Sequence, residues 1–189
     1  VTHNVSNNDS LFDSPVFSCQ ELKVSQEPPS TLNFLASAVG QKYEDIVPMY
    51  IFYALSAHRN ITAVAEIIVP DAEAFVERNQ KALAYLQTTF SSRSHPAICV
   101  REYTGQPAKR TDLSNTWRFF EVPARFSAKY TYIGDIDVFF ISSVMDPGRF
   151  QQMNEFNLPY SNIVRDYNSK PRRLTGLILL ETKRFYTEE

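Results

Sequence analysis

The chain has 189 residues, of which 43% are hydrophobic, and a formal net charge of −2. A chain of this length and composition can bury the core of one domain. The small acidic excess argues against a nucleic-acid partner, because nucleic-acid-binding domains normally carry a strong basic excess. No apolar run approaches the roughly 20 residues that a membrane-spanning helix needs.

Residues 1–46 are predicted to form an irregular lead-in with one short helix. The first 30 residues are polar, contain prolines and show little periodicity. The segment Thr31–Val39 then predicts a short helix that Ser30 or Thr31 caps. Residues 47–189 are predicted to form the main α/β domain, and whether this domain is truncated at its C-terminal end stays open.

The rest of the chain alternates between strand and helix patterns. Val47–Leu55 is a near-continuous apolar and aromatic run, which predicts a strand covered on both faces. Thr62–Val69 predicts a second strand, and Asp71 can cap a helix over Ala72–Thr88. Further strands are predicted at Ala97–Arg101, Tyr130–Ile133 and Leu174–Leu180, helices at Asn115–Val122 and Gly148–Asn157, and a loop at Pro159–Arg173. This order predicts an α/β fold, a three-layer α/β/α sandwich around a mostly parallel sheet.

Two aspartates interrupt the apolar stretch KYTYIGDIDVFFIS. Asp135 and Asp137 are two residues apart, a spacing that points side chains to one face of a strand. Because unpaired carboxylates are costly inside a sheet, the strand is predicted to end near Gly134, with both aspartates at its carboxyl edge. Ligands bind at that edge in open α/β sheets. Carboxylate oxygens suit Mn²⁺ or Mg²⁺, and such a cation suits a diphosphate.

The segment TWRFFEVPARFSAKYTYIGDIDVFF resembles glycosyltransferases of the GT-A fold, of a bacterial type. In that family a hydrophobic strand followed by Asp-x-Asp carries the metal that grips the diphosphate of a nucleotide-sugar. The segment YSNIVRDYNSKPRRLTGL resembles the acceptor-side loop and strand of some members. The resemblance implies a Rossmann-related GT-A fold and a metal-dependent hexosyltransferase of polysaccharide biosynthesis. The expected donor is a nucleotide-sugar, with UDP-sugars favoured, and the expected acceptor is a glycan or lipid-linked hydroxyl.

The resemblance also assigns roles to residues around the two aspartates. Asp137 is implied to bind the metal directly, and Asp135 to contact the metal, its bound water or the donor ribose. Arg118, on the helix before the motif, is implied to reach toward the donor. The alternative for Arg118 is an ion pair with Glu121 on a surface helix, worth a few tenths of a kcal/mol.

Two further groups are assigned through the resemblance. The loop after the first expected strand, with Ala54, Ser56 and His58, is implied to hold the nucleobase and ribose, although a solvent-exposed loop histidine is an alternative. A basic cluster near the last strand is implied to neutralise the departing diphosphate or hold an anionic acceptor, although such charge runs are usually solvated. The cluster consists of Arg165, Lys170, Arg172 and Arg173, of which the three arginines are the implied ligands. The sequence identifies no catalytic base.

Two other functions stay open. Haloacid-dehalogenase-like phosphatases also place an aspartate pair after a buried strand, and there Asp135 would be the nucleophile. The third ligand that many GT-A enzymes supply would be sought just after Thr175-Gly176, where this chain has Leu177-Ile178-Leu179. That departure motivates the alternative of a catalytically silent, GT-A-like interaction domain.

The cellular location is predicted from weaker signals. Cys19 and Cys99 lack metal-ligand spacing, so free thiols in a reducing compartment are expected, with a disulfide left open. A cytoplasmic protein, peripherally associated with a membrane face, is therefore expected. Sequences starting at Asn4, Asn8 and Asn60 fit the N-glycosylation pattern, which keeps a secretory lumen open. Asn60 would crowd the expected donor loop.

Overall fold

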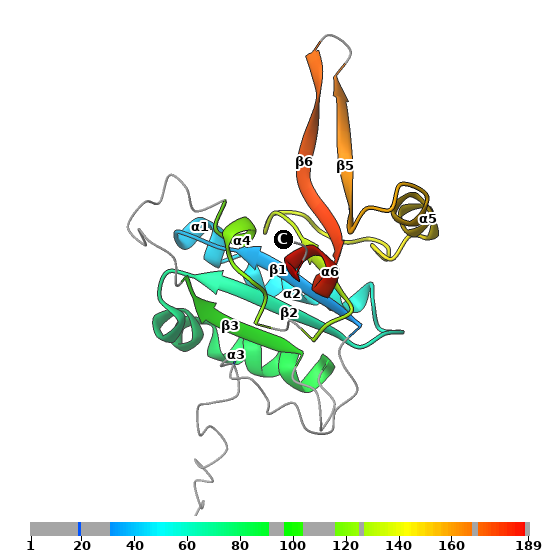
Figure 1. Ribbon diagram of the computed structural model, residues 1–189. Helices are drawn as coiled ribbons and strands as arrows, with labels where there is room; N and C mark the ends of the chain where they lie inside the picture. Colours follow the sequence, from blue (N-terminus) through cyan, green and yellow to red (C-terminus); the bar gives the residue numbers. More distant parts are fainter. Residues whose placement is uncertain are drawn as a thin grey trace, which may run out of the picture.

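The computed structural model describes residues 19, 31–90, 97–103, 116–124, 127–167 and 170–187, with the backbone only over residues 164–175. Six strands form one sheet in the order β3-β2-β1-β4-β6-β5 (Figure 1). The strands span Leu32–Ser37 (β1), Ala63–Val69 (β2), Ile98–Glu102 (β3), Tyr130–Ile133 (β4), Tyr160–Tyr167 (β5) and Lys170–Glu181 (β6). The helices span Gln41–Glu44 (α1), Val47–Ser56 (α2), Ala72–Phe90 (α3), Trp117–Phe120 (α4), Pro147–Glu155 (α5) and Thr182–Thr187 (α6).

The sheet is mixed in strand direction. Strand β1 pairs in parallel with β2 on one side and with β4 on the other, and β3 pairs in parallel with β2. Strand β6 runs antiparallel to both β4 and β5. The predicted α/β class is confirmed in this general form.

The first two predicted elements have the opposite secondary structure: the predicted helix is a strand, and the predicted strand is a helix. The predicted helix at Thr31–Val39 is wrong, because Leu32–Ser37 is strand β1 and every residue in it is buried. The predicted strand at Val47–Leu55 is also wrong, because Val47–Ser56 is helix α2, with Pro48 in its first turn. Both segments are short apolar runs, whose periodicity does not separate a buried strand from a buried helix.

The next elements follow the predictions, apart from shifts at their ends. Strands β2, β3 and β4 and helices α3, α4 and α5 occupy the expected segments. Asp71 caps α3, because its carboxylate accepts a hydrogen bond from the amide of Ala74 at 2.9 Å. The predicted loop at Pro159–Arg173 is wrong, since β5 and β6 form a long hairpin there that stands out from the body (Figure 1).

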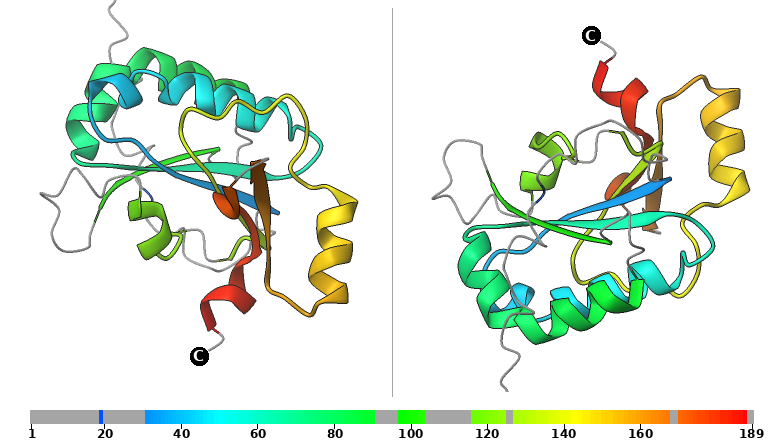
Figure 2. Two further views of the ribbon diagram at one scale, coloured as in Figure 1. Left: turned by 90° about the horizontal axis from the view of Figure 1, so that it is seen from above. Right: turned by 90° about the horizontal axis from the view of Figure 1, so that it is seen from below.

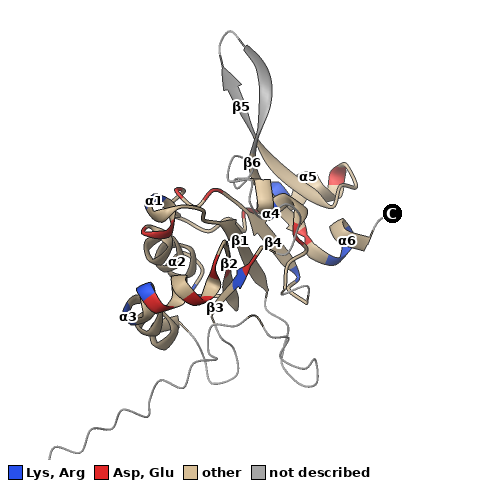
Figure 3. Cartoon of the chain, turned by 90° about the vertical axis from the view of Figure 1, so that its left-hand side faces the viewer, with Lys and Arg blue, Asp and Glu red and all other residues tan. Residues whose placement is uncertain are grey.

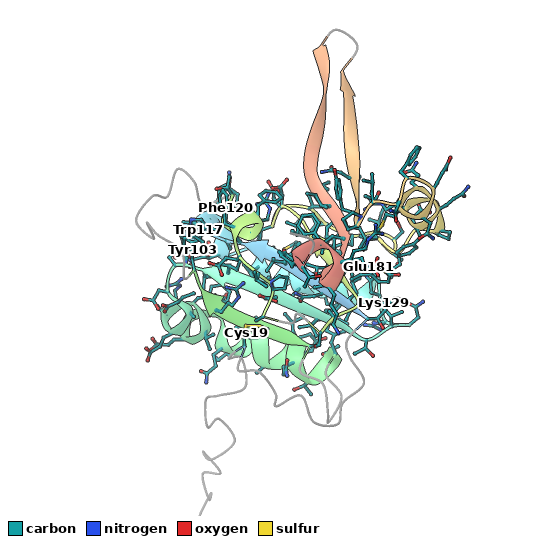
Figure 4. The ribbon with its side chains drawn as sticks, viewed as in Figure 1. Cys19, Tyr103, Trp117, Phe120, Lys129 and Glu181 are labelled. Atoms are coloured by element: carbon teal, nitrogen blue, oxygen red, sulfur yellow. A yellow bond between two sulfur atoms is a disulfide. The ribbon has the colours of Figure 1, made fainter. Side chains whose placement is uncertain are left out.

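Helices lie on both faces of the sheet (Figure 2). The face with α2 and α3 carries the larger core, in which Phe34 and Ile67 from the strands pack with Tyr50 and Phe75 from the helices. The opposite face carries a smaller core around Trp117, next to α4 and α6. Tyr103 stacks on Trp117 with ring centroids 4.4 Å apart, and Figure 4 shows the two side chains next to each other.

The two cysteines form a disulfide, so the expectation of free thiols is wrong. Cys19 is bonded to Cys99 of strand β3, with Cα atoms 5.0 Å apart (Figure 4). The bond connects residues that are 80 positions apart in the sequence. It joins Cys19 to strand β3, which lies at one end of the strand order.

Candidate functional site

The candidate site lies where the carboxyl ends of β1 and β4 meet. These strands are neighbours in parallel register, with Leu35 opposite Ile133, and the amide of Gly134 bonds to the carbonyl of Leu35. Strand β2 lies on one side of this pair, and the later strands β5 and β6 lie on the other. The strand order therefore reverses between β1 and β4, which is where open α/β sheets bind ligands.

The two aspartates follow β4 in a turn. The amide of Val138 donates a hydrogen bond to the carbonyl of Asp135 at 3.2 Å, which closes the turn. Strand β4 ends at Ile133, so the predicted end of the strand near Gly134 is confirmed, and the aspartates that follow it lie in a turn. Ile136 is buried in the core, whereas Asp137 is exposed. The turn thus buries the residue between the aspartates and leaves Asp137 facing solvent.

Arg118 reaches this turn from helix α4. Trp117 anchors α4 in the smaller core, and the guanidinium of Arg118 forms an ion pair with the carboxylate of Asp135. Arg118 is only 5% exposed, and its Nε has no hydrogen-bond partner among the described residues. The surface pair with Glu121 is not formed, since Glu121 bonds to Arg101 instead. Arg118 is therefore a buried cation with a donor left over.

Strand β6 passes close to this ion pair at Gly176. A side chain on Gly176 would bring its Cβ to 3.1 Å from the ring of Phe119 and 3.8 Å from a guanidinium nitrogen of Arg118. The backbone there has φ +70°, which glycine adopts without strain. Gly176 thus lets the strand approach α4, at the place where the family resemblance would seek a third metal ligand.

Two buried tyrosines lie in the electrostatic field of the same pair. Tyr50 of α2 is fully buried, and its hydroxyl has no hydrogen-bond partner within the described part of the chain. Burial raises the pKa of Tyr50, as do Tyr132 and Asp135, while Arg118 lowers it. Burial likewise raises the pKa of Tyr132, with Arg149 of α5 opposing and Asp135 adding to the effect. Both phenols stay protonated at neutral pH and can donate hydrogen bonds.

Asp135 and Asp137 are the two carboxylates that could bind a hard divalent cation at this edge. Asp137 has no bonding partner among the described residues, and the side chain of Asp135 is 37% exposed beside Arg118. Within the described residues no group of three or more His, Cys, Asp or Glu gathers as a metal site. Mg²⁺ is commonly held by one or two carboxylates together with water and substrate phosphates.

The expected nucleotide loop lies elsewhere. Ala54 belongs to α2 and is fully buried, and Ser56 is the last residue of that helix. His58 follows in the connection to the first residue of β2, which is the amino edge of the parallel strands, opposite Asp135. The structure thus does not bring Ala54, Ser56 or His58 to the edge that carries the two aspartates.

His58 is a core residue rather than an exposed loop histidine. Its Nδ1 donates to the carbonyl of Ala54 at 2.6 Å, and its Nε2 accepts from the amide of Val144 at 2.8 Å. The ring contacts Phe34 edge-on at 4.8 Å. Both ring nitrogens are therefore committed to the backbone, and burial lowers the pKa of the imidazole below its ordinary value of 6.5.

The basic cluster is placed only through its backbone. Arg165 of β5 pairs with Arg173 of β6 across the hairpin, and Arg172 lies next to it in β6. The side chains of Arg165, Arg172 and Arg173 lie outside the described residues. The acceptor-side role assigned to them stays a prediction.

A second ion-pair centre is built around the buried carboxylate of Glu66. Glu66 of β2 is fully buried and accepts from Asn33 at 2.8 Å, from Nε of Arg101 at 2.7 Å and from the amide of Ala124 at 2.9 Å. Arg101 also pairs with Glu121 and donates to the carbonyl of Val122. Figure 3 shows charged residues of both signs on the strands as well as along α3. Sequence reasoning missed this centre, although charges inside two apolar strand runs are the signal for it.

Comparisons with known proteins do not identify a family for this chain. No protein-family model matches the sequence, and a search of curated proteins finds no significant match. The helices within the described residues include none that is long and apolar enough to cross a membrane.

Proposed function

We propose that this protein is a metal-dependent glycosyltransferase that moves a hexosyl group from a nucleotide-sugar, with UDP-sugars favoured, to a glycan or lipid-linked hydroxyl. The observation that carries the proposal is the pairing of buried Arg118 with Asp135, next to exposed Asp137, at the reversal of strand order. Opposite charges at that edge suit a ligand that combines a cation with phosphates. The helices on both faces of the sheet support a GT-A-like, three-layer α/β/α arrangement.

Each residue has a distinct task in this mechanism. Asp137 and Asp135 would hold Mn²⁺ or Mg²⁺, and the bound cation supplies positive charge against the donor diphosphate. Arg118 would use its free Nε–H to bind a phosphate oxygen, because guanidinium groups bind phosphate through parallel hydrogen bonds. The hydroxyl of Tyr50, which stays protonated, would donate to the same ligand. Tyr50 is fully buried and Arg118 is 5% exposed, so a ligand would reach their donors only after side chains at this edge move.

An exposed apolar patch supports a lipid-linked acceptor. Met49, Phe52 and Tyr53 of α2 are each at least 37% exposed, and the ring of Tyr53 lies 5.3 Å from that of Phe139. Ile141 is 95% exposed and follows the aspartate turn by four residues. Apolar surface of this kind marks binding sites for other molecules. Phe139 and Ile141 are close in the chain to Asp137, which suits an acceptor with a hydrocarbon part at the face of a membrane.

Calorimetric titration with UDP- and GDP-sugars, with and without Mn²⁺, tests the proposal. We expect heat with a nucleotide-sugar only when the cation is present, and turnover in which the sugar leaves the nucleotide. Arg118→Lys keeps the charge but loses the planar fork, so the donor affinity should fall about tenfold, or about 1.4 kcal/mol. Glu73→Gln, on the exposed surface of α3, is the matched control and should leave the affinity unchanged.

The same titrations separate the two other functions. A phosphatase would bind no nucleotide-sugar and would instead form a phosphate-mimic adduct at Asp135 with a reagent such as beryllium fluoride. A silent interaction domain would bind neither probe while keeping its cooperative unfolding. Either result, obtained with a folded sample and several donors, would overturn the glycosyltransferase proposal.

A further inference from the structure

Asn60 lies in an exposed turn at the edge of the sheet opposite the aspartates. The turn follows α2, where the amide of Ile61 donates to the carbonyl of His58 at 3.1 Å, and Asn60 is exposed. Its side chain has no bonding partner among the described residues. The next two residues complete the sequence Asn60-Ile61-Thr62, which fits the N-glycosylation pattern.

The position of the turn removes the steric objection to a sugar at Asn60. The loop that a glycan was expected to crowd lies at this amino edge, between α2 and β2, and not at the carboxyl edge that carries the two aspartates. The carbonyl of Thr62 accepts from the amides of Thr31 and Leu32, which fixes the turn to β1. A glycan on Asn60 would extend into solvent, away from Asp135 and Asp137.

The disulfide is a second and independent observation. Cys19 and Cys99 are joined across 80 positions of sequence. Disulfides form and persist in secretory and other oxidising compartments and are rare in the cytosol. The disulfide thus favours a secretory compartment, which is where N-glycosylation of an Asn-x-Thr sequence takes place.

We infer that Asn60 is an N-glycosylation site and that the protein matures in a secretory compartment. The side-chain amide nitrogen of Asn60 forms a bond to C1 of an oligosaccharide carried on a lipid diphosphate. The bond between C1 and the diphosphate oxygen breaks, the amide releases one proton, and the lipid diphosphate leaves. The transferring enzyme and the lipid-linked oligosaccharide come from the compartment. This inference does not depend on the proposed glycosyltransferase activity.

Peptide mapping of the protein isolated from the cells that make it tests the inference. Mass spectrometry of non-reduced digests should find a glycan on the Asn60 peptide and a peptide pair linked through Cys19 and Cys99. Treatment with an N-glycan-removing amidase should convert Asn60 to Asp. An unmodified Asn60 peptide would overturn the inference, whatever the state of the cysteines.

Variants of the full chain, translated into microsomes, show that the sequence around Asn60 directs the modification. An Asn4→Gln, Asn8→Gln background leaves Asn60 as the remaining acceptor of this pattern. We expect one amidase-sensitive mobility shift, which Asn60→Gln and Thr62→Ala each abolish and Thr62→Ser preserves. Asn154→Gln, an exposed asparagine outside the pattern, is the matched control. Protease-protected chains that lack the shift would also overturn the inference, because addition to a translocated chain does not require its final fold.

Discussion

Among the described residues, partly buried Arg101 and buried Arg118 each form an ion pair, and the hydrogen bonding around them differs. Arg101 donates to Glu66, Glu121 and Val122, and Glu66 in turn accepts from Arg101, Asn33 and Ala124. Burial opposes the charge on Arg101, but Glu66 and Glu121 outweigh it and raise its pKa. Arg118 instead pairs with Asp135 and keeps a free Nε among the described residues, and its charge lowers the pKa of Tyr50, whose hydroxyl is also unpartnered there.

The difference separates a structural centre from a candidate binding site. Charges buried with several partners hold their surroundings in one arrangement, and the loss of one partner is costly. Buried donors without partners weaken the fold, because each carries a desolvation cost that no bond offsets. Two such donors, Nε of Arg118 and the hydroxyl of Tyr50, belong to residues on which Asp135 acts electrostatically.

The largest effect is expected from Glu66→Ala. The substitution leaves Arg101, Asn33 and the amide of Ala124 without a buried acceptor, so the free energy of unfolding should fall by about 3–5 kcal/mol. Urea denaturation measures it. Glu77→Ala, on the exposed face of α3, should change it by no more than about 0.5 kcal/mol. A loss of less than about 1 kcal/mol for Glu66→Ala would mean that the centre behaves like an exposed ion pair.

The next effect should appear in binding rather than in stability. Asp137 is exposed and has no described partner, so Asp137→Asn should change the free energy of unfolding by no more than about 0.5 kcal/mol. The affinity for a nucleotide-sugar with Mn²⁺ should fall at least about tenfold, because a cation ligand is lost. Calorimetry measures the binding. Unchanged affinity would remove Asp137 from the site.

Tyr50→Phe should leave the free energy of unfolding unchanged or slightly higher, but it should lower the affinity for the donor. Removal of an unpartnered buried hydroxyl should leave the free energy of unfolding unchanged or slightly raised. Loss of one hydrogen bond of about 1 kcal/mol should weaken donor binding by about fivefold. Tyr53→Phe, on the exposed side of α2, is the control and should alter neither. A destabilised Tyr50→Phe with normal binding would show that the hydroxyl serves the fold.

The smallest effect concerns the pH dependence of stability through His58. Burial lowers its pKa below 6.5, and protonation would oppose the hydrogen bond that Nε2 accepts from Val144. The unfolded chain therefore takes up the proton first, so stability present above pH 6.5 is lost as the pH falls through the lower folded pKa. Denaturation curves between pH 7 and pH 5 measure the slope. His58→Gln should reduce this slope, and an unchanged slope would show that other groups set it.

Local patterns were sufficient for the elements with distinct periodicity or caps. Asp71 and the helical spacing after it predicted α3, and the apolar run before Gly134 predicted β4 with aspartates at its end. The type of β1 and α2 was not readable in the same way, because both are short and apolar. Pro48, a residue tolerated in the first turn of a helix, was the available sign for α2.

The composition of the site needed the tertiary structure. The sequence named Arg118, Asp135 and Asp137, and the fold brings Arg118 and Asp135 together across 17 positions. It did not indicate Tyr50, because the relation of Tyr50 to Asp135 depends on how α2 packs. It also placed His58 at the wrong edge, since the type of α2 decides where that helix ends.

The sequence by itself determined the charged and apolar residues from which this protein is built, including the Asp-Ile-Asp turn after a buried strand. Only the tertiary structure decided which charged side chains have all their hydrogen-bond partners and which keep an unpartnered donor. The physical reason is that hydrogen-bond partners such as Glu66 and Arg101 lie 35 positions apart and meet through strand pairing. Burial, which sets the cost of an unpartnered group, is likewise a property of the packed molecule.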